Sequence, residues 1–181
     1  MTPTLPDRRA RLVATALVCA AAWSRLVPHW PNFTAVPAMA LFGAVALGRR
    51  LEAFALPLLA MLVSDLALAA FVYGTDAFVM MPAVYAAIAA TVWIGCLAGR
   101  RPWSLLLAGV GATATFFVTV NCYVWLVSDL YPATAAGLLA CYLAALPYAG
   151  NMLLGTLVYG GALLAIWQLA RSPSSAQPNA T

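Results

Sequence analysis

The stretch AFALPLLAMLVSDLALAAFVYG, residues 53–74, decides the class of fold. A helix needs about 20 predominantly apolar residues to cross the hydrocarbon core of a bilayer. This stretch reaches that length, and its one formal charge is on Asp65. Arg49 and Arg50 precede it, as expected where a helix meets the membrane surface. The stretch therefore predicts a transmembrane helix that contains a single carboxylate.

The composition of the whole chain agrees with this interpretation. Of its 181 residues, 65% are hydrophobic and only 8% are charged, whereas soluble domains carry about 25% charged residues. A water-soluble fold of this length cannot bury so much apolar surface, so lipid is the expected solvent. The net charge of +4 comes from arginines that form no basic face with interleaved aromatic residues, and no nucleic-acid partner is expected.

Other apolar runs lie on both sides of this stretch, and each is predicted to cross the bilayer. They cover residues 12–28, 33–48, 77–99, 103–128 and 148–170. The last apolar region, 131–170, is too long for one span, so Pro147 is predicted to divide it and to leave 133–146 as a short helix at the outer boundary. The prediction is an all-α membrane domain of six spans over residues 1–171, followed by a disordered polar tail over 172–181.

The arginines predict which side of the membrane each end of the bundle faces. Eight of the nine lie before the first span, between spans two and three, between spans four and five, or after span six: Arg8, Arg9, Arg11, Arg49, Arg50, Arg100, Arg101 and Arg171. With six spans these places share one side, which the positive-inside rule identifies as the cytoplasm. Both termini are therefore expected in the cytoplasm, and the location is expected to be a bacterial cytoplasmic membrane.

Polar residues within the apolar runs are instead predicted to gather at the outer end. Asp65 lies twelve residues along its span, about 18 Å from the inner surface. The other candidates for a substrate site fall near outer ends or in outer loops: Arg25, His29, Asn32, Met80, Met81, Tyr85, Asn121 and Asn151. Polar groups are costly inside a membrane and commonly mark function. Their one-sided placement predicts a pocket open to the outside, which suits substrate capture better than a channel.

Structural explanations exist for the same residues. Asp65 would also be explained by an ion pair with Arg25 that holds the bundle together, and His29 by a solvated loop. Interhelical hydrogen bonds or apolar packing would explain Asn121, Asn151, Met80 and Met81.

An enzyme is not expected, because the chain has no phosphate-binding loop, no HExxH motif and no GxSxG motif. Two alternatives to an uptake protein stay open. One is an intramembrane enzyme that uses Asp65 and His29 on a lipid or isoprenoid, and the other is a structural or assembly protein without a ligand.

Several short motifs carry a resemblance to a known family: RLVPHWPNFTAVPAMALFG from Arg25, Leu56-Pro57, Ser64-Asp65, MPAVY from Met81 to Tyr85, and ALPYAGN from Ala145 to Asn151. They resemble small transport proteins related to the substrate-binding S components of energy-coupling-factor (ECF) transporters, and within that group the BtuM family of cobalamin uptake proteins. The resemblance spans most of residues 11–170, and its most specific part is the stretch that begins at Arg25.

The resemblance implies a six-helix bundle with an outer pocket and ligand contacts at His29, Asp65 and Tyr85. It also implies a cysteine thiolate that binds the cobalt of cobalamin and supports removal of cyanide. Met80 stands near that position here, and its thioether is a soft but neutral ligand. We therefore expect binding of cobalamin or a related corrinoid without cyanide removal, with the corrinoid as transported substrate and no cofactor of the protein's own. Another vitamin as the substrate is the alternative.

The same resemblance implies partner chains that supply energy, namely a membrane coupling subunit and two ATPases, although members of the family that act alone are also implied. Small residues let helices approach closely in lipid. A docking face for the coupling subunit is therefore predicted at Ala10, Ala14, Ala16 and Ala20 of the first span, where ordinary packing within the bundle is the alternative.

Overall fold

The computed structural model describes residues 8–48, 51–99 and 101–171, and the regular structure in these ranges is entirely helical. The elements in chain order are α1 (Arg8–Trp23), η1 (Ser24–Leu26), α2 (Val36–Leu47), α3 (Leu51–Leu68), η2 (Ala69–Tyr73), η3 (Gly74–Phe78), α4 (Met81–Leu97), α5 (Pro102–Val127) and α6 (Ala135–Arg171). The all-α prediction is confirmed for this part of the chain. The predicted tail, 172–181, and Arg49, Arg50 and Arg100 lie outside the described residues.

Four helical segments of the described chain are long and apolar enough to cross a membrane: Leu51–Val72, Gly74–Leu97, Pro102–Val127 and Ala135–Arg171. These segments agree with a transmembrane protein. By contrast, α1 has 16 residues and α2 has only 12. At 1.5 Å per residue, α2 is about 18 Å long, well short of a 30 Å hydrocarbon core.

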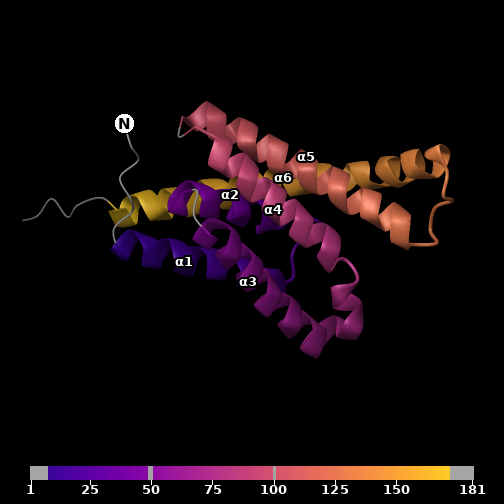
Figure 1. Ribbon diagram of the computed structural model, residues 1–181, viewed down its shortest axis with the longest axis horizontal. Helices are drawn as coiled ribbons and strands as arrows, with labels where there is room; N and C mark the ends of the chain where they lie inside the picture. Colours follow the sequence, from indigo (N-terminus) through magenta and orange to yellow (C-terminus); the bar gives the residue numbers. More distant parts are fainter. Residues whose placement is uncertain (1–7, 49–50, 100, 172–181) are drawn as a thin grey trace, which may run out of the picture.

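Successive helices run in opposite directions, which divides the molecule into two ends (Figure 1). At the end that we call the arginine end, α1, α3 and α5 begin and α2, α4 and α6 finish. Five described arginines belong to this end: Arg8, Arg9, Arg11, Arg101 and Arg171. The opposite end, which we call the loop end, carries η1, the loop of residues 27–35 and the turn between α3 and α4. Arg25 lies there.

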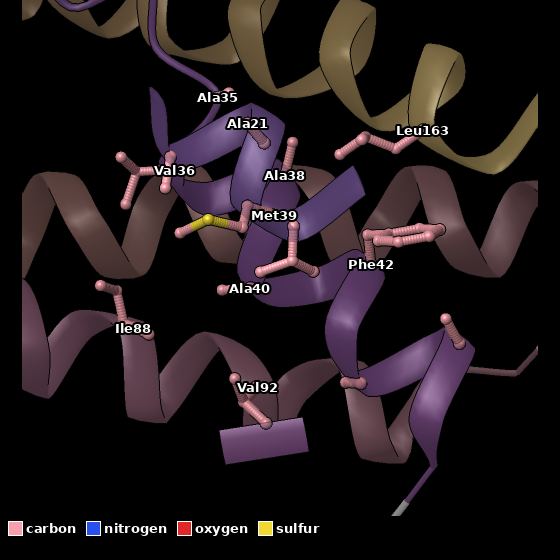
Figure 2. Close-up of a cluster of buried hydrophobic side chains, with 14 of the residues drawn as sticks. Ala21, Ala35, Val36, Ala38, Met39, Ala40, Phe42, Ile88, Val92 and Leu163 are labelled. Carbon is pink, nitrogen blue, oxygen red and sulfur yellow. The ribbon is translucent and has the colours of Figure 1, made fainter. Parts of the chain in front are cut away.

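The short helix α2 forms the centre of the bundle. Ten of its 12 residues are buried, and it packs against α1, α3, α4, α5 and α6. A helix that is apolar on all sides suits such a position, because it has no polar face to present to water. Figure 2 shows Met39 and Phe42 of α2 among side chains from neighbouring helices, including Ile88, Val92 and Leu163. Every other α-helix therefore packs on the core that α2 provides.

The predicted break at Pro147 is wrong, because α6 continues through this residue from Ala135 to Arg171. A proline within a helix removes one backbone hydrogen bond, but neighbouring helices can compensate inside a membrane. Here α5 supports α6 on both sides of the proline. The Tyr142 hydroxyl donates a hydrogen bond of 2.9 Å to the Val118 carbonyl, and Thr113 and Thr156 are joined at 3.2 Å. One long helix therefore replaces the predicted boundary helix and sixth span.

The continuous α6 has 37 residues, about 55 Å in length. It forms a hairpin with α5 that reaches beyond the turn between α3 and α4 (Figure 1). The loop of residues 27–35 contacts α6 at Asn151, sixteen residues after the start of the helix. The first four turns of α6 therefore extend past the rest of the loop end.

Candidate functional site

An ion pair between Arg25 and Asp65 lies at the loop end. The Arg25 Nη1 atom is 2.5 Å from Asp65 Oδ1 and donates a second hydrogen bond to Ser64 Oγ at 2.8 Å. The Tyr85 hydroxyl donates to the other carboxylate oxygen, Oδ2, at 2.9 Å. We call Arg25, Ser64, Asp65 and Tyr85 the loop-end cluster. The ion pair that offered a structural explanation for Asp65 is therefore present, and Tyr85 joins it from α4.

Helical spacing explains how α3 presents its part of this cluster. Residues three and four positions apart share one face of a helix, and Met61, Ser64, Asp65 and Leu68 are all buried. Arg25 enters from η1, directly after α1, and its Nη1 atom also lies 3.5 Å from the Met61 sulfur. Three segments of the chain therefore meet at a single guanidinium group and its carboxylate.

The charged groups of the loop-end cluster are largely buried, so their stability depends on the partners that they have in the folded protein. Asp65 is only 4% exposed, and Ser64 is fully buried. A buried charge without a partner is strongly unfavourable, whereas a charge that is paired and fully hydrogen-bonded is tolerated. Both carboxylate oxygens of Asp65 are engaged by different donors. The cluster therefore fixes η1 and α4 to α3 while its charges compensate each other.

The loop of residues 27–35, which we call the outer loop after its predicted side of the membrane, follows η1 and is held against α6. The Asn151 side-chain amide donates a hydrogen bond of 3.0 Å to the Pro31 carbonyl. The Phe33 ring packs on Tyr159 of α6, with the ring centroids 5.5 Å apart. Asn32 has a positive φ of 59°, a conformation that asparagine tolerates better than most residues. Asn151 thus acts on the loop backbone and links the loop to the bundle.

Gly155 allows this loop to approach α6. A Cβ atom at position 155 would lie 2.9 Å from the Thr34 nitrogen and 3.0 Å from its carbonyl oxygen. Gly155→Ala is therefore expected to displace the loop and to increase its cleavage by an added protease by several fold, because backbone atoms cannot move aside as a flexible side chain does.

Gly161→Ala is the matched control on the same helix, since a Cβ there meets nothing within 4 Å. Equal cleavage rates for the Gly155→Ala and Gly161→Ala variants would contradict the close contact between the loop and α6.

The structure places the remaining predicted residues in the outer loop, at the start of α4 and in the α5–α6 hairpin. His29 and Asn32 are exposed in the outer loop, and Met80 and Met81 are partly buried where α4 begins. Asn121 belongs to the α5–α6 hairpin. Its side-chain amide donates to the Phe117 carbonyl, and its backbone carbonyl accepts from the Cys141 thiol. Cys141 is ten residues before Asn151 on α6, about 15 Å along the axis. Asn121 is therefore displaced from the level of the outer loop.

Two residues of the site were not among the sequence candidates. Ser64 accepts a hydrogen bond from Arg25, and the Met61 sulfur lies beside the same guanidinium group. The signal that identifies them is their spacing from Asp65, one and four residues earlier on a helix. Met80 and Cys96 lie at opposite ends of α4.

Among the described residues, no group of three or more His, Cys, Asp or Glu side chains is placed to hold a metal ion.

The alanine pairs of α1 divide into two faces. Ala10 and Ala14 are buried in the bundle, and the Ala10 carbonyl accepts a hydrogen bond from Trp167 of α6. They serve internal packing, so they are not accessible to a partner. Ala16 and Ala20 are exposed.

A sequence model described as "Family of unknown function (DUF6580)" matches residues 6–178, nearly the whole chain. No curated protein and no solved structure matches the chain significantly.

Proposed function

The chain belongs to DUF6580, a family of unknown function, and we propose that it is a membrane uptake protein that binds a vitamin at its loop end. The preferred substrate is cobalamin or a related corrinoid, and another vitamin is the alternative. The substrate assignment comes from the sequence motifs that resemble BtuM proteins. The position of the site comes from the polar residues at the loop end.

The proposed orientation places the arginine end in the cytoplasm and the loop end outside a bacterial cytoplasmic membrane. In this arrangement all six α-helices contribute to the membrane domain, with the short α2 enclosed by the others, and both termini face the cytoplasm. The support is the collection of Arg8, Arg9, Arg11, Arg101 and Arg171 at one end of antiparallel helices.

The observation that carries the proposal is the buried loop-end cluster beside a loop tethered to α6. Intramembrane charges usually accompany a substrate path or a ligand. The ion pair of Arg25 with Asp65 fixes η1 to α3, and the hydrogen bond of Asn151 to Pro31 fixes the outer loop to α6. Exposed His29 and Asn32 offer polar contacts from the loop, and Tyr85 offers them from α4. Asp65 has both oxygens engaged, which favours a positioning role over proton transfer.

Met80 is the proposed neighbour of the corrinoid metal. It stands directly before α4, and its side chain is partly buried rather than packed in the core. A thioether is a soft ligand, but it lacks the nucleophilic character of a thiolate. The protein is therefore proposed to bind a corrinoid without removing a cobalt-bound cyanide.

ECF partner chains are proposed to couple transport to ATP hydrolysis if the protein does not act alone. Of the predicted docking face on α1, only the exposed Ala16 and Ala20 are accessible to such a partner.

The proposal is tested by purifying the protein in detergent from cells grown with cobalamin and recording its visible absorption spectrum. The expected result is a corrinoid spectrum at one equivalent per chain, shifted or lost in Met80→Ala and unchanged in Met81→Ala. The Met81→Ala control removes a neighbouring sulfur without touching position 80. An unchanged spectrum in both variants would exclude Met80 as the metal contact. A colourless protein that also fails to bind added cobalamin would overturn the corrinoid assignment.

A further inference from the structure

A groove with a volume of about 400 Å³ lies between α5 and α6, with α2 as its floor. It extends along α6 from Thr156 to Gln168 and reaches Pro102, the first residue of α5, at the arginine end. Its lining is mostly apolar, with Leu41 and Leu164 among the contributing side chains, and its polar members are Thr156 and Gln168. None of the four residues of the loop-end cluster lines the groove.

The packing of α5 and α6 explains why this space is left open. The two helices are in close contact near Gly109, where an added Cβ would meet Leu157 at 3.5 Å, and Thr113 bonds to Thr156. Closer to the arginine end, α6 carries Gly160 and Gly161. A Cβ at Gly161 would meet nothing within 4 Å. A Cβ at Gly160 would meet the Ala38 Cβ at 3.8 Å, so the missing side chain that leaves space is the one at Gly161.

The dimensions of the groove favour a single extended chain as its occupant. The twelve-residue rise from Thr156 to Gln168 corresponds to about 18 Å. A volume of about 400 Å³ over that length gives a mean cross-section near 20 Å². An extended acyl chain is narrow enough to lie within a groove of this cross-section, and its apolar surface matches the mostly apolar lining.

The mouth of the groove carries positive charge. Arg101 directly precedes the lining residue Pro102 and is exposed. Arg171 also belongs to the arginine end, but its guanidinium lies 4.3 Å from the centroid of the Trp167 ring, and Trp167 does not line the groove. The N-terminus of α5 adds partial positive charge. Basic sites between helices at the cytoplasmic surface attract anionic headgroups.

We propose that this groove binds an anionic phospholipid, with one acyl chain between α5 and α6 and the phosphate beside Arg101. The inference rests on embedding in a membrane and not on the identity of the transported substrate. The bound chain would fill the space beside Gly161, and the headgroup would lie at the arginine end.

Native mass spectrometry of the protein with added dioleoyl phosphatidylglycerol, compared with dioleoyl phosphatidylcholine, tests the proposal. The wild type is expected to retain one phosphatidylglycerol in preference to phosphatidylcholine. Gly161→Leu fills the groove and is expected to abolish retention. Gly150→Leu is the matched control, because Gly150 also has nothing within 4 Å of an added Cβ and does not line the groove.

A second pair of variants tests the headgroup contact. Arg101→Gln is expected to weaken phosphatidylglycerol retention about five-fold, the effect of about one basic residue near a membrane surface, and to leave phosphatidylcholine unaffected. Arg9→Gln removes an exposed arginine from the same end and is expected to change the retention of neither lipid.

Equal retention in Gly161→Leu and Gly150→Leu would overturn the groove as the site, and equal retention of both lipids by the wild type would overturn the anionic headgroup. A polypeptide that copurifies with the wild type and is lost in Gly161→Leu would replace the lipid by a protein partner.

Discussion

Arg25→Met is expected to destabilise the folded protein by about 3–5 kcal/mol, the usual cost of removing one partner from a buried ion pair. The variant leaves the Asp65 carboxylate, with a side chain only 5% exposed, facing the Tyr85 hydroxyl alone. Asp65→Leu is expected to cost less, because the Arg25 side chain is 22% exposed and can turn its head group toward the polar surface. Reversible unfolding in mixed detergent micelles measures both differences in free energy.

The double variant Arg25→Met/Asp65→Leu is the control for the pairing. It removes both charges and is expected to be more stable than Arg25→Met alone, since an apolar pair can replace a buried ion pair at little cost. Tyr85→Phe removes one hydrogen bond and is expected to cost about 1 kcal/mol. A double variant as unstable as the sum of the two single variants would show that Arg25 and Asp65 do not compensate each other.

Gly95→Ala is expected to destabilise the protein by about 1–3 kcal/mol through overpacking between α2 and α4. An added Cβ would lie 2.6 Å from the Cβ of Ala44 and 3.2 Å from the Leu41 carbonyl oxygen. Neither atom belongs to the end of a flexible side chain, so the two helices must separate. The loss should appear as a lower midpoint of unfolding in detergent, even though alanine is intrinsically the better helix former.

Gly150→Ala provides the matched comparison, because a Cβ at Gly150 meets nothing within 4 Å. Here the helix propensity of alanine acts alone, and stability is expected to rise by up to about 1 kcal/mol. A Gly95→Ala variant as stable as Gly150→Ala would contradict the close packing of α2 against α4.

Much of the helical architecture could be predicted from the sequence because each apolar run is long and bounded by arginine, proline or glycine. The predicted span 103–128 agrees closely with α5 (Pro102–Val127), and the predicted 53–74 agrees with the helical segment that begins at Leu51. The pairing of Arg25 with Asp65 was also accessible, since two opposite charges at one end of an apolar bundle have few other partners.

Other features depend on tertiary contacts that no local pattern records. Pro147 predicts a break, but contacts of α5 on both sides of the proline keep α6 continuous. Asn121 was expected beside the other candidates of the outer site. It lies instead beyond the outer loop, because the continuous α6 lengthens its hairpin with α5. The docking of that loop on Gly155 required a contact between residues about 120 positions apart.

The proposed outward orientation of the loop end, on which the proposed uptake depends, is tested most directly by labelling introduced cysteines in bacterial spheroplasts. The background replaces Cys19, Cys96, Cys122 and Cys141 with alanine, and single variants then carry His29→Cys in the outer loop or Arg9→Cys at the arginine end. A membrane-impermeant maleimide is expected to label the His29→Cys variant in intact spheroplasts, and the Arg9→Cys variant only after permeabilisation. Labelling in the reverse order would contradict a substrate site that faces the outside.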